Sequence, residues 1–438
     1  MKPSKYNFFF PYEADKNKVI AYNSFSNALA LMEKEKHEVF ERFCSDGEAI
    51  GDEEFVQQLK SGHFIIDADC NELEHLRFRM LSSRYSTRLL SLTIAPTSDC
   101  NFRCPYCYEK DIIKPVYMSE QVQDKIIEFV KSQAKTISNL GVTWYGGEPL
   151  MAIDVVEKLS REFIKICEEN DITYYGNIVT NGYLLTKENS RLLKELKVES
   201  MQITIDGNKD IHNVRRPHMD GYDTFETIIN NLVENKDELP VVSIRVNVDK
   251  DNIEQAREVK EILGEKKLLD KMQPYLGKIT AYGQDFDNTK CFDMCGFAEV
   301  DFDYFSKNLD DLGYMHKYPR VVSNACTADA INSFVIASDG ELYRCWVDIG
   351  DTKKSVGNIL SSSQGNEALY LDYIMFDATT DSECSKCNLL PACMGGCPLR
   401  RMNNQDNCTS YKHLLNEYLN IISLKLKLQK DSSESAVV

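Results

Sequence analysis

The sequence contains no apolar stretch long enough to cross a membrane, which takes about 20 predominantly apolar residues. Its first residues, MKPSKYNFFFPYEADK, lack the apolar core and the cleavage site of a secretory signal peptide. None of the seven histidines forms a pair with metal-ligand spacing, and no segment repeats at a fixed period. These absences argue against a membrane-spanning or exported protein and predict a cytoplasmic location.

The chain also has too few basic residues to favour a polyanionic partner. It contains 51 Lys and Arg residues against 68 Asp and Glu residues, which gives a formal net charge of −17. This balance argues against binding to nucleic acid or to an anionic membrane surface, and it permits a basic peptide as partner. With 438 residues, 43% of them hydrophobic, the chain is long enough for two or three globular domains.

Cysteine, by contrast, is abundant. The 15 cysteines are not expected to form disulfides, because the chain has no export signal. Three of them, Cys44, Cys70 and Cys167, are isolated in the sequence, and Cys44 and Cys167 lie in helix-like apolar patterns. We expect these two to be buried structural thiols. The other cysteines fall into or near clusters, which points to metal binding.

The first cluster is the run TSDC-NFRC-PYC, in which Cys100, Cys104 and Cys107 follow the strand-like segment SLTIAP. Thiolates select iron–sulfur, zinc or copper(I) sites. A four-iron cluster held by three thiolates keeps one iron without a protein ligand, and that iron can bind a small molecule. A structural zinc site normally takes four ligands, and no fourth Cys or His lies nearby in the sequence. The pattern therefore favours an iron–sulfur cluster over a zinc knuckle.

Further motifs occur in a fixed order after this loop. The tetrapeptide Gly146–Pro149 reads GGEP, and Cys326, Gly340 and Cys345 read C-x13-G-x4-C. The remaining motif, C-x2-C-x5-C-x3-C followed by one more cysteine, comprises Cys384, Cys387, Cys393, Cys397 and Cys408. Together these motifs resemble the radical S-adenosylmethionine (radical SAM) superfamily with the SPASM extension of peptide- and protein-modifying members. The resemblance spans roughly residues 90–425.

The resemblance implies a [4Fe–4S] cluster on Cys100, Cys104 and Cys107, with S-adenosylmethionine chelated to the open iron. Reductive cleavage of that cofactor gives a 5′-deoxyadenosyl radical, which abstracts a hydrogen atom. Glu148 would accept a hydrogen bond from the methionine ammonium group, and Tyr106 would pack against the adenine. Residues at strand ends could reach the ribose, a carboxylate or the substrate, although a structural role is equally compatible with their positions. The predicted cofactor contacts are Tyr106, Gly146, Gly147, Glu148, Pro149, Thr180, Asn181, Arg245 and Asn247.

Two auxiliary clusters are implied by the C-terminal cysteines. By the resemblance, Cys326, Cys345 and Cys397 bind the first, and the second takes Cys384, Cys387, Cys393 and Cys408. The segment TADAINS after Cys326 lacks the additional cysteine that often completes the first set. Either Cys291 or Cys295 supplies it, or the first auxiliary cluster has an open iron that could bind a substrate thiolate. Structural zinc binding is the alternative for the whole set.

Residues 89–285 alternate strand and helix patterns, which predicts an α/β fold. Six apolar segments, SLTIAP, VTWYGG, TYYGNIVTNG, SMQITIDG, VVSIRVNVD and YLGKITAYG, are expected to pair in parallel with right-handed crossovers. Six repeats are too few for an eight-fold barrel, and the resemblance implies an open partial (β/α)6 radical SAM barrel. Ligands of parallel sheets collect at the carboxyl ends of the strands, where the cluster loop, GGEP and Thr180–Asn181 lie.

Residues 1–88 are expected to form a first domain and residues 286–425 a Cys-rich SPASM domain. In the first domain the strand-like segments YNFFFPY and KVIAYNSFSNALALM precede three helix-like segments. This order resembles a winged-helix-like peptide-recognition element, which binds a leader peptide as an added strand. A domain that merely packs on the barrel is the alternative. Residues 426–438 are expected to be a disordered tail.

These features predict a radical SAM maturase that forms thioether crosslinks, from cysteine sulfur to peptide carbons, in a ribosomally made precursor peptide. The alternatives are an anaerobic sulfatase-maturing enzyme that makes formylglycine, a maturase that makes carbon–carbon bonds or D-residues, and a non-catalytic iron–sulfur scaffold. The expected electron donor is a flavodoxin or ferredoxin. No catalytic base is assigned: Asp206 is a candidate by position only, a turn cap being its favoured role, and His212 is interpreted as a loop residue.

Overall fold

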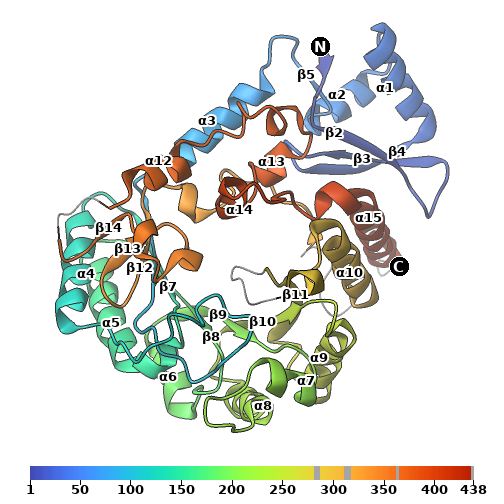
Figure 1. The fold of residues 1–438 in the computed structure, drawn as a ribbon. Coiled ribbons are helices and arrows are strands. Elements are labelled where there is room, and N and C mark those ends of the chain that lie inside the picture. The colour runs from blue at the N-terminus through green and yellow to red at the C-terminus, as the bar shows by residue number, and fades with distance from the viewer. Residues whose placement is uncertain (281–286, 310–316, 362–364, 436–438) are drawn as a thin grey trace. The chain divides into compact units, whose positions relative to one another are not determined.

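The computed structural model describes residues 1–280, 287–309, 317–361 and 365–435 (Figure 1). The chain folds into two compact units, each built from segments distant in sequence. The first comprises Met1–Arg84, Asp293–Cys326 and Phe376–Val438, and the second comprises Tyr85–Phe292 and Thr327–Met375.

The second unit is built on the six strands that the sequence predicts. They are β6 Leu89–Ile94, β7 Asn139–Trp144, β8 Thr173–Thr180, β9 Val198–Thr204, β10 Val241–Val248 and β11 Met272–Lys278. Each strand pairs in parallel with the next one along the chain. Among the described residues β11 pairs only with β10, so the sheet does not close on itself. The α/β prediction is confirmed.

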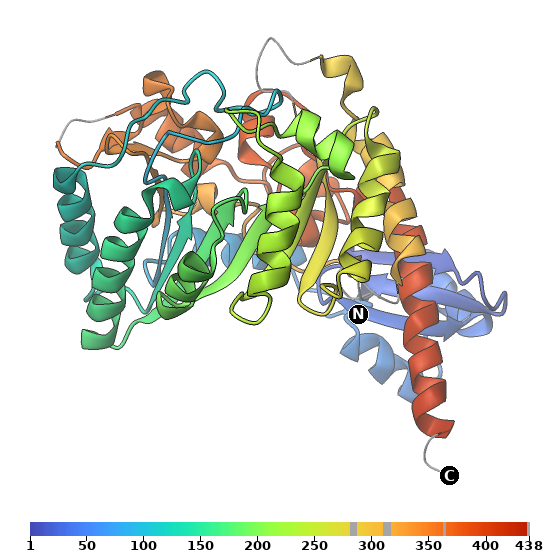
Figure 2. The ribbon, with the colours of Figure 1, turned by 90° about the horizontal axis from the view of Figure 1, so that it is seen from below.

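Helices follow these strands and cover one face of the sheet, as Figures 1 and 2 show. Four of the α-helices begin at an N-cap whose side chain accepts a backbone N–H bond, namely Ser119, Thr186, Asn208 and Asp223. The helical elements here are α4 Glu120–Gln133, η1 Pro149–Ala152, α5 Ile153–Glu169, α6 Lys187–Glu195, α7 Lys209–Arg215, α8 Thr224–Asn235, α9 Ile253–Glu265 and η2 Asn288–Lys290.

The other face of the sheet is polar and partly exposed. Along β6 the side chains of Leu90, Leu92 and Ile94 are buried, whereas those between them are only partly buried, as the two-residue period of a strand requires. Parallel strands covered on both faces usually read as continuous apolar runs. Here one face instead carries Thr93, Thr143, Asn177, Gln202 and Arg245, which suits a ligand-binding surface better than a sealed core.

Three further strands extend this sheet beyond β6. Strand β12 (Ser333–Ile336) pairs in parallel with β6, and β13 (Glu341–Tyr343) and β14 (Gly357–Asn358) follow in antiparallel order. Gly340, at φ +86°, makes the turn between β12 and β13. Because of this pairing, Thr327–Met375 belongs to the second unit. The segment expected to form one SPASM domain over 286–425 is thus divided between the two units. It also contains η4 Thr327–Asp329, η5 Trp346–Asp348, η6 Thr352–Lys354 and α12 Glu367–Met375.

The first unit begins with the strands and helices expected of a peptide-recognition element. Its sheet is antiparallel in the order β2-β3-β4, and β1 pairs with β5. The strand-like segment 18–32 forms two strands joined by a hairpin turn, because the side chain of Asn23 accepts the N–H groups of Phe25 and Ser26 and turns the chain. The elements are β1 Lys2–Pro3, β2 Asn7–Pro11, β3 Lys18–Asn23, β4 Ala28–Glu33, α1 Lys34–Asp46, α2 Glu53–Ser61, β5 Ile65–Ile66 and α3 Glu72–Arg84.

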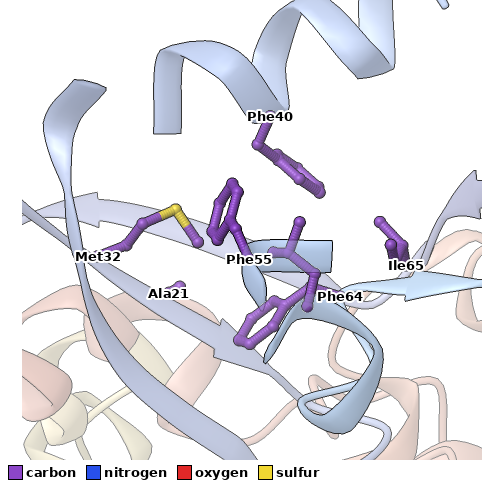
Figure 3. Packing of buried hydrophobic residues seen from close by; sticks show 7 residues of the cluster. Ala21, Met32, Phe40, Phe55, Phe64 and Ile65 are labelled. Carbon is purple, nitrogen blue, oxygen red and sulfur yellow. The ribbon is translucent and has the colours of Figure 1, made fainter. Parts of the chain in front are cut away.

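One face of the three-stranded sheet packs against α1 and α2. Figure 3 shows the side chains of Phe40, Phe55 and Phe64 gathered over those of Ala21 and Met32. Each large side chain buried here contributes about 1.5–3 kcal/mol of transfer free energy. This cluster covers one face of the three-stranded sheet.

The opposite face of that sheet packs against the C-terminal part of the chain. Ile20 and Tyr22 share a buried cluster with Leu389, Leu415 and Leu419. A second cluster joins side chains of both regions, namely Tyr6, Leu76, Met80, Ala378, Leu390 and Met394. Residues 1–84 therefore share their core with the Cys-rich segment. The C-terminal elements of this unit are α10 Met294–Lys307, η7 Cys384–Lys386, α13 Leu390–Cys393, α14 Pro398–Met402 and α15 Tyr411–Ser435.

Two smaller expectations need correction. Residues 426–435, expected to be disordered, continue α15, since the run KLKLQK consists of strong helix formers; 436–438 lie outside the described residues. Cys44 is exposed rather than buried, whereas Cys167 is buried as expected. In the described part of the chain, no helix combines the length and the apolar character needed to cross a membrane.

Candidate functional site

The loop after β6 brings Cys100, Cys104 and Cys107 together in the second unit. Burial raises the pKa of all three thiols, that of Cys107 to about 12, and the neighbouring thiols raise the pKa of Cys100 further. Thiols of this kind stay protonated in the absence of metal and lose their protons when metal binds. The three predicted ligands of the first cluster therefore lie within electrostatic reach of one another.

No three His, Cys, Asp or Glu side chains of the described residues converge on a point that could hold a single metal ion. Each cysteine ligand of an iron–sulfur cluster binds its own iron, so such thiols are not required to converge on one ion. The lack of a single-ion site among the described residues therefore does not test the predicted iron–sulfur cluster at Cys100, Cys104 and Cys107.

The GGEP segment holds the chain immediately before Cys100. A Cβ on Gly147 would overlap the carbonyl group of Asp99, and Gly146 takes the left-handed φ of +100°. The backbone N–H of Glu148 donates to the carbonyl oxygen of Asp99 at 2.8 Å. The two glycines are therefore needed for the close approach of the cluster loop itself. The sequence predicts instead a close approach to a ligand, which stays a prediction.

The carboxylate of Glu148 is 1% exposed and accepts three hydrogen bonds. Oε1 accepts from the Thr180 hydroxyl at 2.7 Å and from the Leu150 N–H at 3.0 Å, and Oε2 accepts from the Asn181 N–H at 2.7 Å. Burial raises the pKa of Glu148, and these donors oppose that shift. A carboxylate has about four acceptor positions, so Oε2 can take one more donor. Pro149 starts the short helix η1.

Thr180 and Asn181, predicted from their position after β8, do meet Glu148. The side-chain amide of Asn181 donates to Oδ1 of Asn101 at 2.7 Å, which connects the end of β8 to the cluster loop. Nδ2 of Asn101 is buried without a hydrogen-bond partner among the described residues. An unpartnered buried donor beside Cys100 fits a site that holds a polar ligand.

Tyr106 is fixed by its hydroxyl group. The hydroxyl donates to Oδ2 of Asp206 and accepts from Nη1 of Arg216 at 2.7 Å and from Nδ2 of Asn247 at 3.3 Å. The guanidinium of Arg215 lies over the Tyr106 ring, 5.3 Å from its centroid. These contacts hold the residue between Cys104 and Cys107 in one orientation, and packing against adenine stays a prediction.

Asp206 is a structural acceptor in this arrangement. Its carboxylate is buried and takes, besides Tyr106, the N–H of Asn247 at 3.2 Å, with Nε of Arg215 at 3.6 Å. His212 is fully buried and accepts the N–H of Asp206 at 3.3 Å. Burial lowers the pKa of His212 well below its usual range, which keeps the ring neutral. This surrounding does not favour Asp206 as a base, and no catalytic base is assigned.

Arg245 and Asn247 lie together on β10, as predicted from their alternation. Nε of Arg245 donates to Oδ1 of Asn247 at 2.7 Å. The guanidinium passes over Gly277 of β11, where an added Cβ would stand 2.6 Å from Cζ. Within the described residues, no carboxylate forms an ion pair with Arg245. A guanidinium that is hydrogen-bonded only to a neutral amide keeps its charge available for an anionic ligand.

Sequence reasoning missed Arg215 and Arg216, which contact Tyr106 and Asp206. Both end helix α7 in the run NVRRP after the Asp206-Gly207 turn. Two adjacent arginines that follow a strand-end aspartate are the signal in the sequence that could have identified them. Asn101 and Gly277 were missed as well, and nothing in their local sequence marks them.

Four C-terminal cysteines lie together in the first unit. Burial raises the pKa of Cys384 to about 12, with smaller contributions from Cys393 and Cys387, and Cys408 adds to the raised pKa of Cys393. A Cβ on Gly396 would overlap the carbonyl of Asn407, so this glycine allows the segment carrying Cys408 to approach. The predicted ligands of the second auxiliary cluster therefore occupy one region.

The predicted first auxiliary set is distributed over both units. Cys326 and Cys397 belong to the first unit and Cys345 to the second. The candidates for a fourth ligand are divided in the same way, Cys291 in the second unit and Cys295 in the first. The pairing of these cysteines stays a prediction.

This chain is similar to known proteins in sequence and in fold. Residues 94–263 match the family model of the Radical SAM superfamily. The chain is 25% identical over 363 residues to the cysteine-type anaerobic sulfatase-maturating enzyme of Clostridium perfringens, covering 74% of this chain and 94% of that one. The structure called native anSMEcpe with bound AdoMet has a TM-score of 0.60 and 23% identity, covering 78% of this chain and 100% of that one.

A second solved structure covers more of the chain. Streptococcus suis SuiB bound to precursor peptide SuiA has a TM-score of 0.53 and 15% identity, covering 93% of this chain and 98% of that one. At 15% identity, the similarity of this structure to the chain shows a shared fold and nothing more. The cofactors used by the radical SAM superfamily are a [4Fe–4S] cluster and S-adenosylmethionine, as the sequence predicts. Residues 94–263 form a radical SAM domain, and the chain is a radical SAM enzyme with sequence similarity to the sulfatase-maturating enzymes.

Proposed function

We propose that this enzyme is a maturase that forms thioether crosslinks in a ribosomally made precursor peptide. One observation carries the proposal: a single chain combines a radical SAM domain with an N-terminal three-stranded sheet that shares buried clusters with the Cys-rich segment. A barrel that generates a radical needs no such element for a small substrate. A leader peptide bound at a distance from the reaction centre would use it.

The residues near Cys100 fit S-adenosylmethionine. Oε2 of Glu148 keeps an acceptor position for the methionine ammonium, and the Asn101 amide offers an unused donor. Arg245, on the polar face of the sheet, offers its guanidinium to a carboxylate. When bound, the cluster and its cofactor supply a carbon radical that abstracts a hydrogen atom from the substrate.

The chain's own residues hold the reactants in place. Thr180 and Asn181 fix the Glu148 carboxylate, and Gly147 fixes the loop before Cys100. Low exposure of Glu148 and Asp206 keeps water away from this side of the site. Positioning of this kind contributes to catalysis because it removes the entropy cost of aligning reactants.

The recognition element offers strand edges to a leader peptide. In the order β2-β3-β4, β2 and β4 are the edges of the sheet. Edge strands present unpaired backbone groups that a peptide can pair with, gaining affinity from main-chain hydrogen bonds. We therefore assign leader binding to residues 1–88, with a precursor peptide as partner and a flavodoxin or ferredoxin as electron donor. A cytoplasmic location goes with this proposal.

Two auxiliary clusters complete it. Cys384, Cys387, Cys393 and Cys408, which lie together, would hold one, and Cys326, Cys345 and Cys397 would hold the other. An open iron in the latter would bind the substrate thiolate. Thioether formation removes one hydrogen atom from a peptide carbon and one proton and one electron from the cysteine side, so an electron acceptor is required, and an auxiliary cluster is the one we assign.

The test uses anaerobically reconstituted enzyme, reduced with dithionite in the presence of S-adenosylmethionine. Release of 5′-deoxyadenosine is expected, together with about one crosslink per cofactor consumed when a Cys-containing precursor peptide is supplied. Mass spectrometry after alkylation should show a loss of two hydrogens at cysteines that no longer react. A peptide returned unmodified, or modified without loss of free thiol, would contradict thioether formation.

The second candidate is formylglycine formation on a sulfatase. It is favoured by the 25% identity that extends over 94% of the sulfatase-maturating relative. Against it, anSMEcpe is covered completely while roughly a fifth of this chain has no counterpart there. A synthetic peptide carrying a sulfatase cysteine motif separates the two functions. Conversion of its cysteine to an aldehyde would favour the sulfatase reading, and an unchanged peptide would favour thioether formation.

A further inference from the structure

The arginine pair at the end of α7 has no part in the function proposed so far. Arg215 and Arg216 are adjacent, both are largely buried, and both contact Tyr106. Tyr106 lies between two predicted cluster ligands. The two arginines nevertheless differ in how their charges are compensated.

The charge of Arg215 is offset by carboxylates. Its Nη1 lies 2.9 Å from Oδ2 of Asp249, and its Nε lies 3.6 Å from Oδ2 of Asp206. A buried cation with two carboxylate partners is the usual arrangement in protein interiors. Nε and Nη2 of Arg215 also have no hydrogen-bond partner among the described residues, but these carboxylates offset its charge.

Arg216 has no such pair. It is 8% exposed, and no carboxylate of the described residues stands in ion-pair contact with it. Its polar contact is the 2.7 Å hydrogen bond from Nη1 to the Tyr106 hydroxyl, and its guanidinium lies 5.7 Å from the centre of the Phe102 ring. Nε is buried without a partner. A buried cation without an ion-pair partner is unfavourable unless a negative charge nearby stabilises it.

Asp206, which shares the Tyr106 hydroxyl with Arg216, supplies part of that charge, and the cluster loop supplies the rest. Phe102 and Tyr106, the two residues on which Arg216 rests, alternate with Cys100, Cys104 and Cys107 along the loop. Arg216 donates to the hydroxyl of Tyr106, which lies between Cys104 and Cys107, whereas Arg215 lies over the ring of that residue. Three thiolates make an assembled cluster anionic, and reduction adds one more negative charge. A buried cation nearby therefore stabilises the reduced form more than the oxidised form.

We propose that Arg216 is a positioning residue that sets the reduction potential of the S-adenosylmethionine-binding cluster and fixes its loop through Tyr106. The inference rests on the proposed function only in taking Cys100, Cys104 and Cys107 as cluster ligands. It assigns two separable effects to one side chain. The guanidinium charge raises the potential, and the hydrogen bond to Tyr106 orients the loop.

The experiment uses the full-length chain, reconstituted with iron and sulfide without oxygen and titrated with dithionite. The signal to follow is the part of the electron paramagnetic resonance spectrum that changes when S-adenosylmethionine is added, because the auxiliary clusters do not bind that cofactor. R216Q is expected to make this cluster at least tenfold harder to reduce, a shift of about 59 mV to lower potential for one electron. R216K should recover at least half of that shift.

Two further variants separate the effects. Y106F keeps the charge of Arg216 and loses the hydrogen bond, so its potential should stay near that of the wild type while its affinity for S-adenosylmethionine falls several-fold. R215Q is the matched control, an adjacent buried arginine whose charge is already offset. Its shift should be smaller than that of R216Q.

The outcomes are decisive in both directions. An unchanged potential and spectrum in R216Q with full iron content overturns the proposal. Loss of iron in R216Q that R216K restores supports it, whereas equal loss in R216Q, R216K and R215Q assigns α7 a purely structural role and overturns it. None of these readouts needs a peptide, so failure of the thioether proposal leaves the test intact.

Discussion

The second unit takes its core from one continuous sheet, in which each of six parallel strands pairs with its neighbour in the chain. The first unit takes its core from separate clusters of aromatic and aliphatic side chains, two of which join residues from both ends of the chain. The sheet is regular enough to form from its own segment. The first unit depends on a loop-rich Cys segment with few backbone pairs of its own. Folding of the first unit should therefore depend on metal and folding of the second should not.

Iron removal is the largest expected effect. In metal-free protein, or in the C384S/C393S variant, residues 1–84 should lose hydrogen-exchange protection, because Leu390 and Met394 no longer hold Tyr6 and Leu76. The expected loss of protection corresponds to the whole free energy of unfolding of the first unit, about 5–15 kcal/mol for a domain. Strands β6 to β11 should remain protected. The control is C44S, an exposed cysteine. Equal protection of both units without iron would refute the comparison.

The next effect compares one glycine from each unit. An alanine at Gly147 would overlap Asp99, and one at Gly396 would overlap Asn407. Each substitution should cost about 4 kcal/mol or more, since neither backbone neighbour can move aside. Urea unfolding followed by hydrogen exchange should assign the loss in G147A to the second unit and in G396A to the first. G51A is the control, because nothing lies near its added Cβ.

Removal of a core ring tests the recognition element alone. F40A should destabilise the first unit by about 3–5 kcal/mol, because Phe40 is buried against Phe9 at 5.1 Å between ring centres. The exposed F78A variant, at a side chain 74% exposed, should change stability by less than about 0.5 kcal/mol. Thermal unfolding of the two variants gives the comparison. A similar loss in both would mean that the cluster in Figure 3 does not carry the stability of this element.

The smallest expected effect is a pH dependence of the stability of the second unit. Burial raises the pKa of Glu109 from 4.5 to about 7, and its Oε1 has no hydrogen-bond partner in the described residues. A raised carboxyl pKa favours the folded state below pH 4.5, and this contribution disappears as the pH rises through 7. E109Q should therefore be more stable than the wild type at pH 8 by at most roughly 3 kcal/mol, at 1.36 kcal/mol per pKa unit, and nearly equal at pH 4.5.

Urea unfolding of the second unit at the two pH values measures this difference. The exposed E120Q variant serves as control and should show no comparable pH dependence. If the stability difference between the wild type and E109Q were the same at both pH values, this result would contradict the buried position of Glu109.

Much of the fold follows from local sequence pattern. The six parallel strands are predicted correctly because each is a short apolar run bounded by turn residues, and the three N-terminal helices because their apolar residues recur at helical spacing. The β3–β4 hairpin is missed because its turn uses Asn23 and Ser26 in place of glycine. The pairing of β12 with β6 is missed because strands 240 residues apart leave no local signal of their contact.

Some site residues are likewise predicted from the local sequence, and others are not. Glu148, Thr180 and Asn181 are predicted as a group because all three follow strands whose carboxyl ends share one edge, and the structure does bring them together. The contact of Gly147 with Asp99 is missed, because sequence does not show which backbone segments approach each other. Arg216 is missed because its importance comes from the absence of a carboxylate partner, and sequence does not show which charges remain unpaired.

The distribution of each unit over distant segments has a consequence for synthesis. The polypeptide passes from one unit to the other four times, after Arg84, Phe292, Cys326 and Met375. During translation the strands of the parallel sheet emerge and can pair before the partners of Ile20 and Tyr22 on α15 are made. Residues 1–84 must then wait, with apolar surface uncovered, until α15 has been made. Nascent chains should need chaperone protection over that interval, and fragments ending before α15 should aggregate.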